Sequence, residues 1–194
     1  MFINKNKNIH VILGNGPSLD GYRTIKNATV WGINRIFLAP IKVDNYLALD
    51  RHLWRFEGKR IEQLKATKYY LPERYKDLAE IAIHQHKIKT FTYAEKPTDF
   101  LKDNKIGHGY TSVFATIQLA ILDGATEIQF FGVDFASETN RSHFYGLVQR
   151  SPKFWTLGKK SFLIALNKLD ELGIKFKVNS HLFNRDISKQ KEAI

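Results

Sequence analysis

The residues best suited to chemistry begin with a glycine turn near the N-terminus. The run Gly14-Asn15-Gly16-Pro17-Ser18 follows a short apolar stretch. Glycine accepts φ > 0 and lets another group approach the backbone closely, and proline fits the first position of a helix. N–H groups at the start of a helix suit a phosphate or sugar oxygen. We therefore predict that these five residues bind a nucleotide.

Three further polar residues stand at or just after the C-terminal ends of expected strands: Asn34, Asp50 and Asp134. Open α/β sheets bind their ligands at this edge, so Asn34 is a candidate nucleotide contact. Asp50 is equally well explained as the N-cap of the next helix or as a ligand of a ribose hydroxyl or a metal. Asp134 is a candidate catalytic carboxylate, with a cap or a salt bridge as the structural alternative.

A long polar segment, residues 136–153, carries the charged groups that could close over a bound ligand. Loops of this length are often lids or binding loops. Arg141, Tyr145 and Arg150 are predicted to contact phosphate. His143 is the candidate general base for an acceptor hydroxyl.

The pair Thr111 and Ser112 opens a strongly apolar stretch that ends at Gly124. Either residue could be the N-cap of a helix, and glycine is a usual residue just beyond a helix end. Both are also predicted to lie at the nucleotide site.

Strands and helices that would position these side chains alternate along the chain. Strands are expected at 9–13, 29–34, 43–50, 69–71, 88–93, 127–131 and 174–178, and helices at 17–26, 51–65, 73–84, 113–122 and 154–172. Neither a repeat nor a break in composition divides the chain, so one domain is expected over residues 1–194, with a polar tail from 184.

The string Gly14-Asn15-Gly16-Pro17-Ser18-Leu19 resembles the N-terminal loop of bacterial sialyltransferases of the Campylobacter type (glycosyltransferase family 42). It also resembles the MptE-like family, whose archaeal members are hydroxymethylpterin diphosphokinases. A second block, Thr111-Ser112, an apolar helix and then Gly132-Val133-Asp134-Phe135, is similar to the sialyltransferase pattern Thr-Ser-Gly, helix, strand, Gly-x-Asp-Phe. The resemblance implies an α/β fold, a single Rossmann-like domain with a mostly parallel sheet flanked by helices.

Two departures from the sialyltransferase pattern bear on activity. Val113 replaces the glycine after the Thr-Ser pair. The segment Gly158-Lys159-Lys160-Ser161 stands where the sialyltransferases place the histidine of a Gly-His-Ser segment, and here that histidine is missing. Val113 bears on how closely another group can approach the backbone there, and the missing histidine leaves His143 as the substitute base.

Three functions follow from this pattern. The leading one is a sialyltransferase-like glycosyltransferase that uses a nucleotide or nucleotide-sugar donor. The first alternative is a diphosphokinase using ATP, in which Asp50 and Asp134 would hold Mg²⁺. The second is a non-catalytic protein that binds a nucleotide or another polyanion.

The composition limits partners and location. The chain has 194 residues, no cysteine and a net charge of +11, which favours anionic ligands. The basic residues are scattered, so nucleic acid is an unlikely partner. No apolar run reaches the roughly 20 residues of a membrane span. We expect a cytoplasmic location, and a homo-oligomer is an option because compact nucleotide enzymes are often oligomeric.

Overall fold

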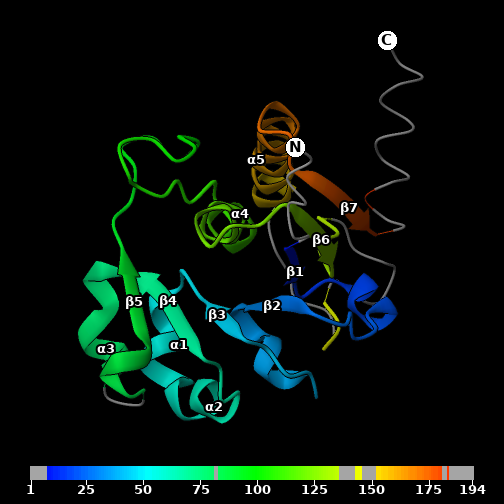
Figure 1. Ribbon diagram of the computed structural model, residues 1–194. Coiled ribbons are helices and arrows are strands. Elements are labelled where there is room, and N and C mark those ends of the chain that lie inside the picture. The colour runs from blue at the N-terminus through cyan, green and yellow to red at the C-terminus, as the bar shows by residue number, and fades with distance from the viewer. Residues whose placement is uncertain (1–7, 81–82, 136–142, 146–151, 181–182, 184–194) are drawn as a thin grey trace, which may run out of the picture.

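The computed structural model describes residues 8–80, 83–135, 143–145, 152–180 and 183, and one parallel sheet organises them (Figure 1). The strands of this sheet are β1 (Ile9–Leu13), β2 (Ala28–Ile33), β3 (Asn45–Leu47), β4 (Lys68–Pro72), β5 (Ile88–Phe91), β6 (Glu127–Phe131) and β7 (Lys175–Asn179). Their order is β5-β4-β3-β2-β1-β6-β7, and every pairing between neighbours is parallel. The predicted α/β fold with a mostly parallel sheet is confirmed.

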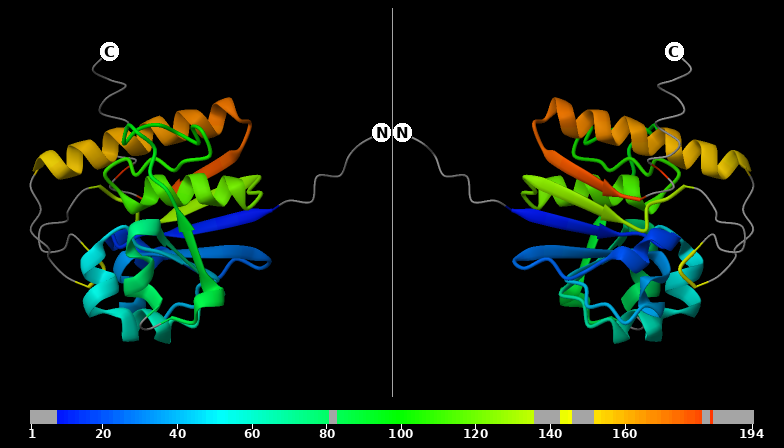
Figure 2. Two further views of the ribbon diagram at one scale, coloured as in Figure 1. Left: turned by 90° about the vertical axis from the view of Figure 1, so that its left-hand side faces the viewer. Right: turned by 90° about the vertical axis from the view of Figure 1, so that its right-hand side faces the viewer.

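Helices cover both faces of the sheet (Figure 2). The α-helices are α1 (Arg51–Phe56), α2 (Gly58–Gln63), α3 (Lys76–Glu80), α4 (Ser112–Leu122) and α5 (Pro152–Glu171), and the 3₁₀ helices are η1 (Pro17–Gly21), η2 (Asn34–Leu38), η3 (Glu73–Tyr75) and η4 (Gln85–Lys87). The helices α4 and α5 lie on one face, and α1, α2 and α3 lie on the other. None of the described helices is long and apolar enough to cross a membrane.

Strand β1 lies inside the sheet between β2 and β6. From β1 the chain adds β2 to β5 on one side of it and then β6 and β7 on the other side. The point where strand order reverses is where open α/β sheets form a crevice. The predicted bounds 9–13 and 127–131 are confirmed. The first run is almost wholly apolar, the second carries the buried Ile128, Phe130 and Phe131 between polar residues, and a glycine follows each. Strand β6 lies between β1 and the edge strand β7.

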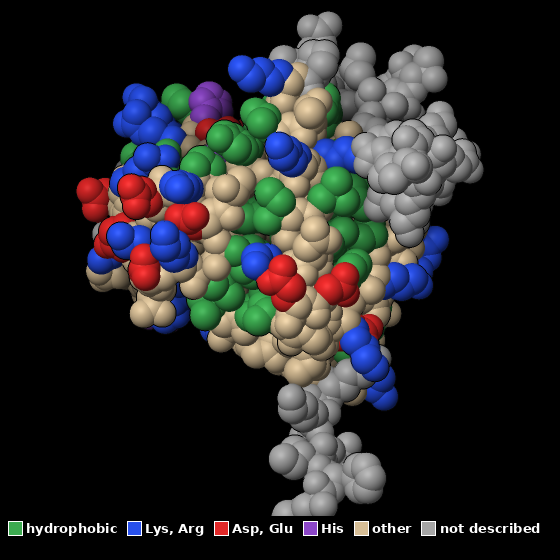
Figure 3. Space-filling view, turned by 90° about the horizontal axis from the view of Figure 1, so that it is seen from above, with side chains coloured by type: hydrophobic (Ala, Val, Ile, Leu, Met, Phe, Trp, Pro, Cys, Tyr) green, Lys and Arg blue, Asp and Glu red, His purple; other side chains and the backbone are tan. Residues whose placement is uncertain are grey.

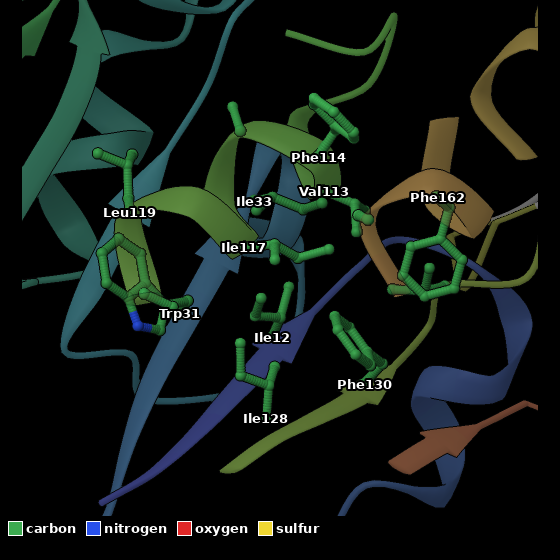
Figure 4. Close-up of a cluster of buried hydrophobic side chains, with 14 of the residues drawn as sticks. Ile12, Trp31, Ile33, Val113, Phe114, Ile117, Leu119, Ile128, Phe130 and Phe162 are labelled. Atoms are coloured by element: carbon green, nitrogen blue, oxygen red, sulfur yellow. The ribbon is translucent and has the colours of Figure 1, made fainter. Parts of the chain in front are cut away.

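Two hydrophobic cores hold the layers together. Under α4 and α5, Ile12 and Phe130 of the sheet meet Phe114 and Ile117 of α4 and Phe162 of α5, all fully buried (Figure 4). On the opposite face a second core contains Tyr46, Trp54 and Tyr69. Strand β1 contributes to both cores, so the strand that leads into the crevice is packed on both faces.

Several predicted elements are shorter than expected. The predicted helix 51–65 is two helices, because Glu57 adopts a non-helical conformation (φ −114°, ψ 10°) before Gly58, a residue that disfavours a helix interior. The predicted strand 43–50 is paired only over Asn45–Leu47. The predicted helix 73–84 is η3 followed by α3, and residues 81–82 lie outside the described part.

Surface charge does not gather into one basic patch on the face that Figure 3 shows. Lysine and arginine side chains there are interspersed with acidic ones and with uncharged surface. This pattern agrees with the scattered lysines of the sequence and gives no support on this face to a nucleic-acid surface.

Candidate functional site

A cleft of about 630 Å³ opens at the C-terminal edge of the sheet. Residues just beyond β1, β2 and β6 line it, namely the Gly14–Gly16 turn, Asn34 with Arg35, and the segment 132–135. The N-terminal end of α4 and the first turn of α5 complete the walls. The cleft therefore occupies the crevice that the strand order creates.

The glycine turn is joined to the segment after β6 by its backbone. The N–H of Gly14 donates to the Phe131 carbonyl oxygen and that of Gly16 to the Gly132 carbonyl oxygen, each at 2.7 Å. A Cβ atom added at Gly14 would stand 2.2 Å from the Gly132 oxygen. Glycine is needed here for this close approach of two backbones.

This pairing corrects the prediction that free N–H groups of the turn hold a phosphate. The N–H groups of Gly14 and Gly16 are already used, and the N–H of Ser18 donates to Oδ2 of Asp134 at 2.9 Å. The predicted helix 17–26 is only the 3₁₀ helix Pro17–Gly21, which is too short to add a helix dipole. Pro17 and Ser18 do not line the cleft; Pro17 is buried, and Ser18 Oγ accepts a hydrogen bond from the Gly132 N–H.

Asn15 lines the cleft, and its side chain joins the turn to the end of β2. Its Nδ2 donates to the Ile33 carbonyl oxygen at 3.0 Å, while its buried Oδ1 has no partner among the described residues. A buried acceptor without a partner is destabilising by about 1–3 kcal/mol. Because this oxygen is shielded from solvent, the Asn15 side chain serves to tie the turn to the end of β2.

Asn34 lines the cleft beside Asn15 and is fixed by hydrogen bonds from two residues. Its backbone is left-handed (φ 50°), its carbonyl oxygen accepts from the Tyr46 hydroxyl at 2.6 Å, and its Oδ1 accepts from Ser112 Oγ at 2.8 Å. Asparagine tolerates this conformation better than most residues. The fixed amide leaves Nδ2 as its donor at the cleft.

Asp134 lines the cleft, and its carboxylate has structural partners there. Oδ2 accepts from the Ser18 N–H, and Oδ1 accepts a short hydrogen bond from Ser180 Oγ. A Cβ atom at Gly16 would meet Oδ2 at 2.2 Å. Asp134 therefore faces the glycine turn, with both carboxylate oxygens accepting hydrogen bonds there, and its catalytic role stays a prediction.

Asp50 and Thr111 cap helices at the rim of the cleft. Asp50 Oδ1 accepts from the His52 N–H at 2.8 Å, and Thr111 Oγ1 accepts from the Val113 N–H at 3.3 Å. Val113 itself is buried in the core. Within the described residues no group of three or more His, Asp or Glu side chains is placed to hold a metal.

The segment 143–145 reaches the glycine turn. The N–H of Phe144 donates to the Asn15 carbonyl oxygen at 2.9 Å, and His143 and Tyr145 line the cleft with their rings 5.0 Å apart. His143 is buried and lies beside Trp155 of α5, with ring centroids 6.1 Å apart. Arg141 and Arg150, and most of the proposed lid over 136–153, lie outside the described residues.

Sequence reasoning missed the far end of the cleft, beyond β4 and β5. Arg74, Tyr93, His108 and Tyr110 line it. Arg74 is the second residue after the end of β4, and Tyr93 is the second residue after the end of β5. Extending the strand-end rule to every strand would have found both.

Burial shifts the pKa values of Tyr93 and His108 at this end of the cleft. It raises the pKa of Tyr93 to about 12, against a smaller opposing effect of Arg74. It also lowers the pKa of His108, and the positive charge of Arg74 lowers it further. At neutral pH Tyr93 is therefore a phenol and His108 is a neutral imidazole.

Comparison with known proteins adds evidence at the level of structure alone. No protein-family model matches the chain, and no curated protein matches it. The sialyltransferase CstII from Campylobacter jejuni, in complex with the substrate analogue cytidine-5′-monophosphate, aligns with a TM-score of 0.58 and 16% identity over 89% of this chain and 80% of its own.

A second structure of sialyltransferase CST-II, in complex with a trisaccharide acceptor and CMP, aligns with a TM-score of 0.57 over 88% of this chain and 80% of its own, also at 16% identity. The resemblance to the MptE-like family finds no support in these comparisons. The chain therefore has the Rossmann-like α/β fold that these sialyltransferases have.

Proposed function

We propose that this protein is a glycosyltransferase that uses a nucleotide-sugar donor, with a cytidine nucleotide as the first candidate. The observation that carries the proposal is the pair Asn15 and Asn34, fixed on neighbouring strand ends at the point where the strand order reverses. The likeness in fold to sialyltransferases solved with CMP supports it.

The two asparagines have different parts in the proposal. Asn34 offers a donor, Nδ2, because its Oδ1 is used by Ser112, and a base edge or a ribose presents acceptors for such a donor. Asn15 fixes the turn beside it through the bond from Nδ2 to the Ile33 carbonyl oxygen. We assign the nucleotide to this wall, with its phosphate toward Tyr145, whose segment is joined to the turn through Phe144.

His143 is the proposed general base. It is buried at the cleft, close to the turn that would hold the nucleotide. In the reaction, the acceptor oxygen forms a bond to the anomeric carbon as the bond from that carbon to the phosphate oxygen breaks. The acceptor proton passes to His143, and the nucleoside monophosphate leaves with the electron pair. None of residues 158–161, where the sialyltransferase histidine was sought, lines the cleft.

The reaction is proposed to proceed without Mg²⁺. A diphosphokinase would need carboxylates free to hold the metal, whereas Asp134 accepts two hydrogen bonds and Asp50 caps α1. No observation favours the diphosphokinase or the non-catalytic binder over the transferase.

A direct test measures CMP release from a CMP-sugar, with lactose as acceptor, in buffer containing EDTA or Mg²⁺. We expect turnover in both buffers and a fall of about 10²–10⁴-fold in His143→Gln. The matched control is His86→Gln, which changes an exposed histidine away from the cleft. Turnover that requires Mg²⁺, or that survives in His143→Gln, would contradict the proposed mechanism.

A thermal-shift panel of CMP, UMP, GDP and ATP tests binding separately from turnover. A ligand that binds only the folded protein raises its melting temperature. We expect CMP to give the largest rise. A shift only with ATP and Mg²⁺ would favour the diphosphokinase instead.

A further inference from the structure

The far end of the cleft, formed by Arg74, Tyr93, His108 and Tyr110, is built differently from the nucleotide wall. The Arg74 guanidinium lies over two aromatic rings, 4.8 Å from the centroid of Tyr75 and 5.0 Å from that of Tyr93. Such stacking holds a guanidinium in place while leaving its edge able to donate hydrogen bonds. The charge at this end is therefore oriented in advance.

Arg74 carries that charge without a carboxylate partner in the described part of the chain. The ion pairs there join Arg35 and Arg60 to Glu57, Lys68 to Asp123, and Lys168 to Glu171. Guanidinium groups recognise carboxylates and phosphates with paired hydrogen bonds. An arginine that lines a cleft and has no carboxylate partner among the described residues thus suits an oxyanion.

The aromatic residues beside Arg74 provide hydrogen-bond donors. Tyr93 lies edge-on to His108 at 5.3 Å, and His108 lies edge-on to Tyr110 at 5.4 Å. His108 Nδ1 accepts from the Tyr110 N–H at 3.1 Å, so the proton of the neutral ring is on Nε2. The phenol hydroxyls and this N–H are groups that can donate to an anion.

The loop that carries His108 and Tyr110 is fixed by one buried side chain. Gln118 of α4 is fully buried; its Oε1 accepts from the N–H groups of Leu101 and Gly107, and its Nε2 donates to the Gly107 carbonyl oxygen. Gly109 N–H donates to the Pro97 carbonyl oxygen at 2.8 Å. These bonds hold the donors in position before any ligand arrives.

Exposure indicates which substrate meets this end. Arg74 and Tyr110 are open to solvent, and Tyr110 is 41% exposed, whereas Asn15 and His143 at the other end are 8% and 7% exposed. A donor nucleotide fills the closed end, so a larger molecule that extends out of the protein enters at the open end. The acceptor is that molecule.

We propose that the acceptor is a saccharide that carries an oxyanion, a carboxylate or a phosphate, and that Arg74 is the residue that recognises it. The inference rests on the proposed function. The stacked guanidinium provides the charge, and Tyr93 and His108 orient the anionic group through hydrogen bonds.

The test compares saccharides with and without the anion, titrated calorimetrically into the full-length protein with CMP present. The probes are lactose against 3′-sialyllactose, which adds a carboxylate, and galactose against galactose 6-phosphate. We expect the wild-type protein to bind at least one anionic member at least five-fold more tightly than its neutral counterpart. Arg74→Gln should remove that preference and leave neutral saccharides unchanged.

Arg55→Gln is the matched control, because Arg55 is exposed, stacks on Phe56 at 5.1 Å and lies outside the cleft. It removes the same charge and the same type of contact. An equal loss in both variants, an equal loss for neutral saccharides, or no preference in the wild type would overturn the proposal. The two probe pairs separate a carboxylate from a phosphate.

A titration of CMP itself, together with the same saccharide titrations without CMP, distinguishes this inference from the proposed function. If CMP fails to bind but the anionic preference and its dependence on Arg74 persist, the proposed function fails and the anion site stands. If CMP binds and the anionic preference is absent, the inferred anion site fails and the proposed nucleotide site stands. If Arg74→Gln instead weakens only a CMP-sugar with a carboxylate on its sugar, the site belongs to the donor, and the assignment to the acceptor is wrong.

Discussion

Gly16→Ala tests how tightly the glycine turn is packed against the segment that follows β6. A Cβ atom at this position would lie 2.2 Å from Asp134 Oδ2 and 2.9 Å from the Gly132 carbonyl oxygen. Both distances are shorter than real carbon–oxygen contacts. The φ of Gly16 is −75°, which alanine adopts easily, so the cost comes from the clash alone.

Either response to the clash loses hydrogen bonds. If the carboxylate moves, it loses the Ser18 N–H; if the turn moves, Gly16 loses the Gly132 oxygen. A hydrogen bond to a charged group contributes about 1.5–3 kcal/mol, and overpacking costs about 1–3 kcal/mol. We expect the free energy of unfolding to fall by about 2–3 kcal/mol, which lowers the melting temperature by about 4–12 °C in a chain of this size.

Urea unfolding followed by circular dichroism measures the effect, and Gly21→Ala is the control. A Cβ atom at Gly21 meets nothing within 4 Å, so that variant should be within about 0.5 kcal/mol of the wild type or slightly more stable. In an Asp134→Ala background Gly16→Ala should cost at least about 1 kcal/mol less. A Gly16→Ala variant as stable as Gly21→Ala, or no coupling to Asp134, would refute this reasoning.

Three further predictions concern groups that support the cleft. Burial lowers the pKa of His10, with smaller effects of Asp123 and Lys68, and its Nδ1 accepts from Trp31 Nε1 at 2.9 Å; below about pH 6.5 the unfolded chain therefore binds a proton that the folded chain does not. The free energy of unfolding should therefore decrease as the pH is lowered below this value, by at most about 1.4 kcal/mol per pH unit from this group. An equally steep pH dependence in His10→Gln would contradict its role. Gln118→Leu leaves two N–H groups without their acceptor and should expose the loop 94–110 to faster hydrogen exchange; unchanged exchange would show that other contacts hold the loop. Tyr46→Phe removes the hydroxyl that donates to the Asn34 carbonyl oxygen and should lower the free energy of unfolding by about 1 kcal/mol and weaken CMP binding, and equal affinity in calorimetry would remove Tyr46 from the account of the site.

The sequence predicted the elements whose signal is local. The apolar run 9–13 and the run 127–131, in which polar and apolar residues alternate up to Phe130, are each followed by a glycine and are recognisable as strands without any knowledge of the fold. Placement of Asn34, Asp50 and Thr111 at the cleft followed from their positions at strand ends and at a helix start. Their roles as binding residues stay predictions, as do the homo-oligomer and the cytoplasmic location.

The rest depends on contacts between distant residues. The Ser18 N–H is used by Asp134, 116 residues away, so nothing near the turn could show that its donors are occupied. Asn34 is left-handed because Tyr46 and Ser112 hold it. That conformation makes Asn34→Ala a strained variant, and Asn34→Asp is the cleaner replacement, because aspartate also tolerates left-handed backbone.

The most direct test of the account is the affinity of CMP for the wild type and for Asn34→Asp, measured by calorimetry. The substitution keeps an oxygen for Ser112 Oγ but replaces the donor Nδ2 with a negatively charged oxygen. Asn167→Asp, at an exposed position of α5, controls for the added charge. We predict that CMP binds the wild type and Asn167→Asp equally and binds Asn34→Asp about ten-fold or more weakly. Equal binding to all three proteins, or no binding to the wild type, would contradict the assignment of this cleft to a cytidine nucleotide.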